Sequence, residues 1–269
     1  LPFHTWLPDA HAEAPTAGSV MLAGVLLKMG GYGFLRICLP MFPDASATFA
    51  PFILWLSVLG IVYGGFMALA QDDLKKLVAY SSISHMGFVT LGIFVFNSEG
   101  IQGAILQMFN HGIVTGAMFL AVGQLYDRTH SRLIGEYGGL HKQMPRFVAL
   151  LCLFSVASFG LPGTGSFIGE FLVLLGTSEK SFVMVLLAMG GIVLAASYLP
   201  WMLQRVALGP AATRAASLLP DLTVREAATL VPLALIVISV GVYPGPLLEM
   251  MDASVENLIQ LMDKRLPIE

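Results

Sequence analysis

Apolar segments long enough to cross a lipid bilayer recur along almost the whole chain. Of its 269 residues, 56% are hydrophobic and only 12% are charged, and the mean hydropathy is +0.79. A hydrocarbon slab about 30 Å thick is crossed by roughly 20 apolar residues in a helix, and one soluble core cannot absorb so many runs of that length. The sequence therefore predicts an all-α integral membrane protein, folded as a multi-span helical bundle, and excludes a soluble domain.

The positions of the apolar runs predict seven spans within a membrane domain of residues 1–245. They are expected at about 16–39, 49–70, 77–96, 101–125, 146–176, 182–204 and 226–243. The fifth run is too long for one straight helix. It contains Leu161-Pro162-Gly163-Thr164-Gly165, where the proline removes a backbone donor and the glycines loosen the chain. We expect a discontinuous helix there, with its break lining an aqueous cavity.

Basic residues are divided unequally between the two ends of these spans. By the positive-inside rule, the end that carries more Lys and Arg faces the cytoplasm or its organellar equivalent. That end holds Lys75, Lys76, Arg128, Arg132, Lys142, Arg146, Arg205, Arg214 and Arg225. The opposite end holds Arg36, Lys180, Lys264 and Arg265. The chain is expected to start on the first side and to finish on the second.

Residues 246–269 have a different pattern from the spans. Apolar residues recur at helical spacing, and acidic residues occupy the other face. The apolar set is Leu247, Leu248, Met251, Val255, Leu258, Ile259 and Met262, and the acidic set is Glu249, Asp252, Glu256 and Asp263. The pattern predicts an amphipathic interfacial helix, which either caps the bundle or docks against a neighbouring subunit.

Lys28 lies in the middle of the first predicted span. The only charges between Thr16 and Leu39 are Lys28 and Arg36, and Arg36 is close enough to the end to reach the headgroups. Twelve residues at about 1.5 Å each place Lys28 roughly 18 Å from Thr16, near the bilayer midplane. An ammonium at that depth costs at least about 2.5 kcal/mol, so it needs water, a cavity or an anionic partner. An ion or proton pathway is the default interpretation.

Three further ionisable residues are expected at a similar depth: His85, His111 and Glu170. Either histidine alone is as readily explained by a structural hydrogen bond between helices. Lys28 and Glu170 are harder to explain structurally, because each is a costly buried charge and the two could compensate each other. Groups that hydrogen-bond water and change protonation near pH 7 can pass protons. We therefore predict that these four residues form a proton relay.

Polar neighbours at helical spacing accompany the two histidines. Ser81 and Ser82 share the helix of His85, and Gln107 and Thr115 share that of His111.

Other kinds of site have no recognisable pattern in the sequence. There is no CxxC or HxxxH for a metal, and no GxGxxG, GxxxxGK[ST] or nucleophile elbow for a cofactor or soluble catalysis. Cys38 and Cys152 lie in apolar segments and are expected to be inert hydrophobic residues. A net charge of -3 provides no basic stripe for nucleic acid.

The string QDDLKKL at 71–77 contains Asp72, Asp73, Lys75 and Lys76. We interpret the lysines as solvated loop charges that set topology. The neighbouring aspartates leave open a vestibule for proton uptake.

Four strings of the sequence closely resemble one family. PFHTWLPDAHAEAPTAGSVMLAGVLLKMGGYGFLR at 2–36, QDDLKKLVAYSSISHMGF at 71–88, QMFNHG at 107–112 and FGLPGTGSFIGEF at 159–171 are similar to subunit M, or chain 4, of respiratory NADH:quinone oxidoreductase, complex I. The resemblance covers nearly the whole chain. It implies that Lys28 is the central-axis lysine, that His85 and His111 are linking histidines, and that Glu170 is the terminal acidic residue on a broken helix.

The resemblance also implies an antiporter-like fold and a function. The chain is expected to be the C-terminal portion of a fourteen-helix subunit that moves protons while other subunits pass electrons from NADH to quinone. Those subunits would bind NADH, FMN, the Fe-S clusters and the quinone, and this chain would hold no cofactor. Its expected partners are other membrane and peripheral-arm subunits of complex I, the lipid bilayer, protons and internal water.

The expected location is an energy-coupling membrane, bacterial rather than mitochondrial. The family's paired glutamate and lysine on two earlier helices would lie upstream of Leu1.

Two alternatives remain open. One is the D-type component of a multisubunit Na+/H+ antiporter, or the membrane arm of a related hydrogenase, which share the fold and the buried lysine. The other is a non-transporting structural anchor, whose buried polar residues only fix the register of the helices.

Overall fold

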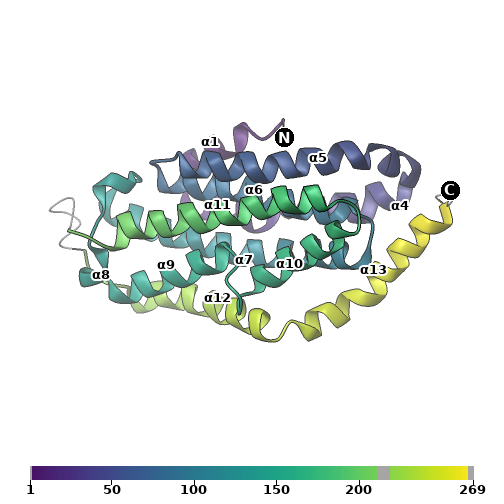
Figure 1. Cartoon of the computed structure of the whole chain (residues 1–269). Helices are drawn as coiled ribbons and strands as arrows, with labels where there is room; N and C mark the ends of the chain where they lie inside the picture. The colour runs from purple at the N-terminus through teal and green to yellow at the C-terminus, as the bar shows by residue number, and fades with distance from the viewer. Residues whose placement is uncertain (1, 211–218, 266–269) are drawn as a thin grey trace.

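A computed structural model of the chain describes residues 2–210 and 219–265. Every named element in these ranges is a helix, and no strand is formed within them. Most of the helices run side by side along one axis (Figure 1), which confirms the predicted all-α bundle. In chain order the elements are α1 (Trp6–Glu13), α2 (Thr16–Met21), the π-helix η1 (Leu22–Leu26), α3 (Leu27–Gly33), the π-helix η2 (Phe34–Cys38), α4 (Leu39–Met41), α5 (Pro43–Leu69), α6 (Leu74–Phe94), α7 (Ser98–Thr129), the 3-10 helix η3 (Ile134–Glu136), α8 (Leu140–Gln143), α9 (Pro145–Ser158), α10 (Gly165–Ser178), α11 (Phe182–Ala207), α12 (Val224–Val242) and α13 (Gly245–Arg265).

Six helical stretches within the described residues are long and apolar enough to cross a membrane. They are Thr16–Met41, Pro43–Leu69, Leu74–Phe94, Ser98–Thr129, Phe182–Ala207 and Val224–Val242. Each corresponds to one of the unbroken runs expected from the sequence. α6 begins before its apolar stretch, because the Asp73 side chain accepts hydrogen bonds from the backbone of Lys75 and Lys76.

The remaining predicted span is interrupted, as its Pro-Gly sequence indicated. α9 ends at Ser158 and α10 begins at Gly165. Gly160 and Gly163 have φ values of +76° and +96°, in the left-handed region that glycine adopts without a steric penalty. Residues 161–163 are exposed on the surface of this chain, whereas residues 164–166 are buried. The discontinuous helix is confirmed, while the cavity expected beside its break stays a prediction.

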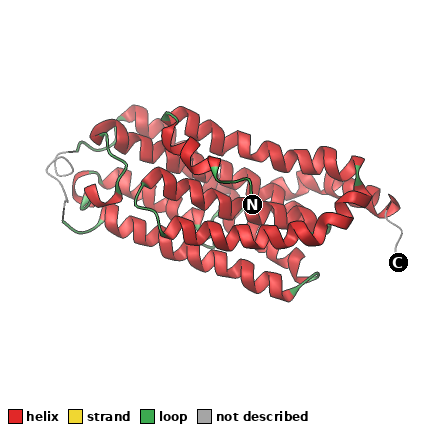
Figure 2. Ribbon diagram, turned by 90° about the horizontal axis from the view of Figure 1, so that it is seen from above, coloured by secondary structure: helices red, strands yellow, loops and turns green. Residues whose placement is uncertain are grey.

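α6 and α7 lie at the centre of the bundle and position the buried polar residues. α6 packs against α5 on one side and α7 on the other, and α7 packs in turn against α10. Figure 2 shows these long helices running alongside one another when the bundle is seen from above. Because neighbours cover most of their faces, polar side chains on α6 and α7 are directed toward other helices rather than toward lipid.

The two ends of the bundle match the predicted division of charges. α8 lies at one end, together with the starts of α6 and α9, and α4 and the end of α13 lie at the other (Figure 1). Arg214 and the side chains of Lys264 and Arg265 lie outside the part of the chain that the structure describes.

α13 has the predicted two-sided character. Val255 and Met262 are each only 2% exposed, and the helix packs against α4 and α7. On its polar face, the Asp252 carboxylate accepts a hydrogen bond from Gln102 Nε2 at 2.9 Å. The apolar face is therefore covered by the bundle, and a location at the membrane interface stays a prediction.

Candidate functional site

Lys28 follows a local change in helix type. The π-helix η1 occupies Leu22–Leu26, directly before the turn that carries Lys28. A π-helical turn loosens the regular i to i-4 pattern and so leaves carbonyl groups available to side chains. The Lys28 ammonium donates to the Ala23 carbonyl, five residues earlier. The backbone thus provides one of the polar partners that an ammonium at this depth requires.

His111 on α7 is the second partner of Lys28. Lys28 Nζ lies 2.6 Å from His111 Nδ1. A charged Lys28 donates to this nitrogen, so the ring proton is then on Nε2. The contact depends on a close approach of the two helices, because a Cβ added at Gly112 would lie 2.9 Å from the Gly24 carbonyl oxygen. His111 is only 2% exposed.

Glu170 on α10 is held by residues from both central helices. Its Oε1 accepts from His85 Nδ1 of α6 at 2.9 Å and from Gln107 Nε2 of α7 at 2.9 Å. Ser158, the last residue of α9, donates to His85 Nε2 at 3.3 Å. Glu170 and His85 are 3% and 4% exposed, respectively. The broken helix therefore contributes a residue on each side of its break.

The two pairs, Lys28–His111 and His85–Glu170, adjoin each other. The His85 and His111 ring centroids are 5.7 Å apart and the rings are tilted by 56°. Both rings line one small pocket, together with Gln107, Val114, Thr115, Ser158 and Ser166. His111 Nε2 is buried and has no hydrogen-bond partner among the described residues. Polar side chains from four helices, α6, α7, α9 and α10, thus surround the step between the histidines.

The sequence suggested that Lys28 and Glu170 could compensate each other's charge directly. In the structure each of them has other partners instead. Lys28 is bound by Ala23 and His111, whereas Glu170 is bound by His85 and Gln107. Two imidazoles therefore stand between the ammonium and the carboxylate. This arrangement suits stepwise proton transfer better than a salt bridge does, because a neutral imidazole can accept at one nitrogen and donate at the other.

Lys28 also lines a groove on the surface of the chain. The groove has a volume of about 560 Å³ and is otherwise mainly apolar, bordered by Val20, Gly24, Tyr32 and Gly116 among others. The ammonium therefore lies between this groove and His111.

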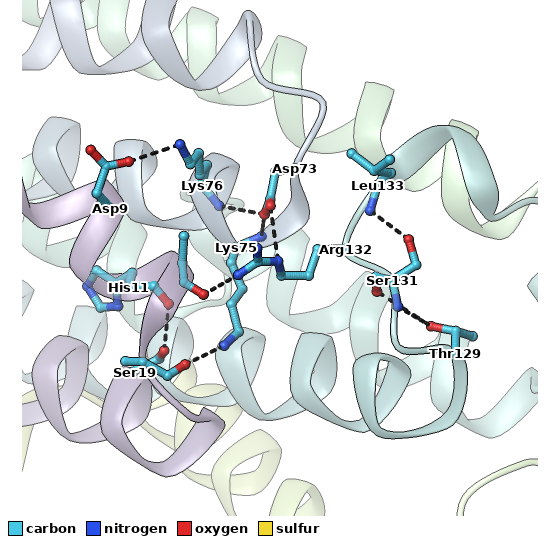
Figure 3. A network of polar contacts seen from close by, with 12 residues as sticks. Asp9, His11, Ser19, Asp73, Lys75, Lys76, Thr129, Ser131, Arg132 and Leu133 are labelled. Carbon is cyan, nitrogen blue, oxygen red and sulfur yellow. Dashed lines mark hydrogen bonds and ion pairs between the residues drawn. The ribbon is translucent and has the colours of Figure 1, made fainter.

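The environment of Lys75 differs from the sequence interpretation, which was wrong for this residue. Lys75 is only 3% exposed, and its ammonium donates to the Ala14 carbonyl at 2.8 Å. Lys76 behaves as expected of a solvated charge: it pairs with Asp9 at 2.9 Å and keeps 38% of its side chain exposed. Figure 3 shows the two lysines directed toward different parts of the N-terminal segment.

Some contributors to the site could not be singled out from the sequence. Ser158 is one of several serines in the apolar segments, and nothing in the sequence distinguishes it. No sequence pattern predicted the π-helix before Lys28. Gln107 could be identified, because it is four residues from His111 on the same helix face. Among the described residues, no cluster of side chains could hold a metal ion.

Comparison with known proteins places this arrangement in a family. The family described as "NADH:quinone oxidoreductase/Mrp antiporter, TM" matches residues 1–195. NADH-quinone oxidoreductase subunit M of Rhodobacter capsulatus is 50% identical over 259 residues, which are 96% of this chain and 51% of the relative. NADH-ubiquinone oxidoreductase chain 4 of Chondrus crispus is 50% identical over 262 residues, which are 97% of this chain and 53% of the relative. The chain thus spans about half the length of the curated relatives it matches.

Solved structures give the same placement. A chain of respiratory complex I from Thermus thermophilus with bound NADH matches 97% of this chain and 55% of its own length, with a TM-score of 0.91 and 33% identity. A chain of the Mrp complex from Dietzia sp. DQ12-45-1b matches 97% of this chain and 58% of its own length, with a TM-score of 0.87 and 19% identity, and so shares the fold. Since the family match covers 195 of the 269 residues, this chain belongs to the NADH:quinone oxidoreductase/Mrp antiporter transmembrane family.

Proposed function

We propose that this chain is a proton-translocating membrane part of an NADH:quinone oxidoreductase, in which Lys28, His111, His85 and Glu170 act in sequence as a proton relay. The observation that carries the proposal is the pair of contacts, Lys28–His111 at 2.6 Å and His85–Glu170 at 2.9 Å, with the centroids of the two histidine rings 5.7 Å apart. Four ionisable groups on separate helical segments have no structural need to converge in this way.

The relay works by exchange along hydrogen-bonded groups. A proton taken up at Lys28 passes to His111 Nδ1. It crosses to His85 where the two imidazole rings adjoin, and then reaches the Glu170 carboxylate. Release from Glu170 is controlled by the charge state of the other members, because charges a few ångströms apart in a poorly screened interior shift one another's proton affinity. The chain itself supplies no electrons, and NADH, FMN, the Fe-S clusters and quinone would belong to other subunits.

The proposed partners are the remaining membrane and peripheral-arm subunits of the oxidoreductase. Curated relatives at about 50% identity are oxidoreductase subunits, whereas the similarity to the Mrp complex chain is one of fold at 19% identity. This difference favours the oxidoreductase over an Na+/H+ antiporter. Relatives from Rhodobacter and Rickettsia accord with a bacterial membrane, and residues 1–245 would form its membrane domain, with α13 at the interface.

The test compares two basic residues of the same predicted span. Lys28→Ala and Arg36→Ala are introduced into the complete oxidoreductase, which is reconstituted in vesicles, and proton uptake and NADH:quinone turnover are measured together. We expect Lys28→Ala to reduce proton uptake below about a third of the wild-type rate. Arg36 is exposed and outside the relay, so its variant should retain uptake.

Two outcomes would contradict the proposal. Wild-type proton uptake in an assembled Lys28→Ala complex would show that the chain is a structural anchor, in which the buried polar residues only fix the register of the helices. Full activity of Lys28→Arg would also count against it, because a guanidinium does not release its proton.

A further inference from the structure

A second groove lies between α9 and α12, at the end of the bundle that carries more basic residues. This α9–α12 groove has a volume of about 430 Å³. The two helices pack against each other, and Figure 1 shows them side by side near that end. Ala149 of α9 and Ala227 of α12 both line the groove. Because a single methyl group fills little space, these two positions leave a hollow where longer side chains would meet.

The walls of the α9–α12 groove are apolar and open to the surroundings of the chain. Leu150 and Val231 line its two sides, and Val224 at its mouth is 90% exposed. From Thr223 to Val231 the lining residues of α12 cover about 12 Å of helix length. α12 is long and apolar enough to cross a membrane. The groove therefore opens toward the hydrocarbon of a bilayer, where acyl chains are the surrounding medium.

Arg146 gives the mouth of the groove an unpaired positive charge. It is the second residue of α9, it is exposed, and it lines the groove. Among the described residues, no hydrogen bond or ion pair uses its guanidinium. The two nearby carboxylates have other donors. Asp221 accepts from the backbone of Arg146 and Phe147 at 3.2 Å each, and Glu226 pairs with Arg128 at 2.8 Å.

A free guanidinium above an apolar groove is complementary to a molecule with an anionic head and a hydrocarbon tail. The planar fork of a guanidinium matches the oxygens of a phosphate group. Anionic phospholipids are concentrated in the cytoplasmic leaflet, and basic pockets between membrane helices on that side bind their headgroups. A zwitterionic headgroup carries its own cation, so it gains less from Arg146. Charge complementarity thus favours one class of ligand.

We propose that the α9–α12 groove binds an anionic phospholipid of the bilayer, with the phosphate on Arg146 and one acyl chain between the two helices. The lipid joins the helices that flank the break of the fifth span. α9 ends at Ser158, which donates to His85, and α12 packs on the break at Gly241. The lipid therefore holds together two supports of the buried site. This inference goes beyond the proposed proton transport and does not depend on it.

Photo-crosslinking in the complete oxidoreductase tests the site directly. The complex is reconstituted in phosphatidylcholine vesicles that contain a trace of phosphatidylglycerol with a diazirine in one acyl chain. After illumination, labelled peptides are identified by mass spectrometry. We expect labelling of the α9 and α12 peptides around Leu150 and Val231. Added phosphatidylglycerol without the diazirine should compete for the site, whereas more phosphatidylcholine should not.

Three variants separate the contributions of head and tail. Arg146→Gln should reduce the labelling about fivefold, which corresponds to the roughly 1 kcal/mol that one basic residue contributes near an anionic surface. Arg225→Gln is the matched control, because Arg225 is exposed at the same end and does not line the groove. It should change the labelling less than twofold. Ala227→Leu fills the groove and should remove most of the labelling while Arg146 is kept.

Three results would overturn the proposal. Equal labelling by diazirine analogues of phosphatidylglycerol and phosphatidylcholine would show ordinary bilayer lipid at this surface. Wild-type labelling in Arg146→Gln, or in Ala227→Leu if the arginine variant does not assemble, would show that the groove is not the site. Absence of labelling in the wild type would show that another protein chain covers the groove. Labelling requires no electron transfer, so its outcome is independent of the proton-uptake tests of the relay.

Discussion

Glu170 joins the two central helices at the site, because one of its carboxylate oxygens accepts from both His85 and Gln107. Both donors can be satisfied by an amide oxygen as well as by a carboxylate, so a neutral replacement preserves the shape of the site. The chemistry of Glu170 can therefore be tested without dismantling its surroundings.

Glu170→Gln should assemble but lose most of its quinone-coupled proton uptake, because an amide cannot ionise. Glu170→Asp should keep a substantial part, since it retains an ionisable group at the cost of one methylene of reach. Both are measured as proton uptake per NADH oxidised. Equal uptake by the Gln variant and wild type would show that ionisation at this position is dispensable.

His11 should also make stability depend on pH. Burial, followed by the positive charges of Lys75 and Lys28, lowers its pKa from 6.5 to about 4 in the folded chain, so between these values the unfolded chain binds more protons than the folded one. Stability is therefore lost as pH falls from about 6.5 toward 4. The melting temperature of His11→Leu, relative to wild type, should rise over that interval. A constant difference between pH 7 and pH 5 would contradict the neutral, buried state of His11.

The four relay residues could be predicted from the sequence. A charge or an imidazole within an apolar run is costly to bury, whichever helices pack around that run. Their pairing could not be predicted, since it depends on how α3, α6, α7 and α10 pack. The burial of His11 and Lys75 was not predicted for a related reason. Both lie in or beside short polar segments, and their burial results from the packing of α1 against α6 and from the stacking of His11 on Phe119 of α7.

At the scale of helices, the break between α9 and α10 is the element that most directly shapes the site. It brings Ser158 and Glu170 onto the same histidine. α12 packs closely against the break, because a Cβ added at Gly241 would overlap the Gly163 carbonyl and the Thr164 backbone. The Pro-Gly sequence predicted this break. The two π-helices around α3 were not predicted, since no residue type enforces them.

Gly241→Val should destabilise the complex by about 1–3 kcal/mol, because the added side chain forces α12 away from the break. Gly190→Ala on α11 is the matched control. Nothing lies within 4 Å of its added Cβ, and alanine in a helix interior is favoured over glycine by roughly 0.5–1 kcal/mol. Thermal unfolding of the purified complexes measures both effects. Wild-type stability of Gly241→Val would show that α12 does not pack tightly on the break.

At the scale of the whole molecule, the distribution of basic residues between the two ends of the bundle predicts which end faces the cytoplasm. The number and positions of the spans could be predicted from the lengths of the apolar runs and from the Pro and Gly residues that interrupt them. These are local features of the sequence that do not depend on how the helices pack. The packing of α13 could also be predicted, because its apolar residues and its acidic residues fall on opposite faces of the helix. What surrounds the Lys28 groove in the proposed oxidoreductase depends on other chains, and the sequence of this chain does not encode it.

The predicted orientation can be tested with single cysteines in a background lacking Cys38 and Cys152. A cysteine at Lys142 should react with a membrane-impermeant maleimide from the cytoplasmic side only. A cysteine at Lys180 should react from the opposite side, because α9 and the broken α10 lead from one end of the bundle to the other. Reaction of both positions from the same side would contradict the orientation.

The central claim, that Lys28, His111, His85 and Glu170 form one relay, is tested most directly by a double-mutant cycle. Proton uptake per NADH oxidised is measured for Lys28→Ala, Glu170→Gln and the combined variant in the complete oxidoreductase. Residues that serve one pathway have non-additive effects, so the combined variant should lose no more than the worse single variant. Losses that multiply in the combined variant would show that the two residues act independently and that the relay is not continuous.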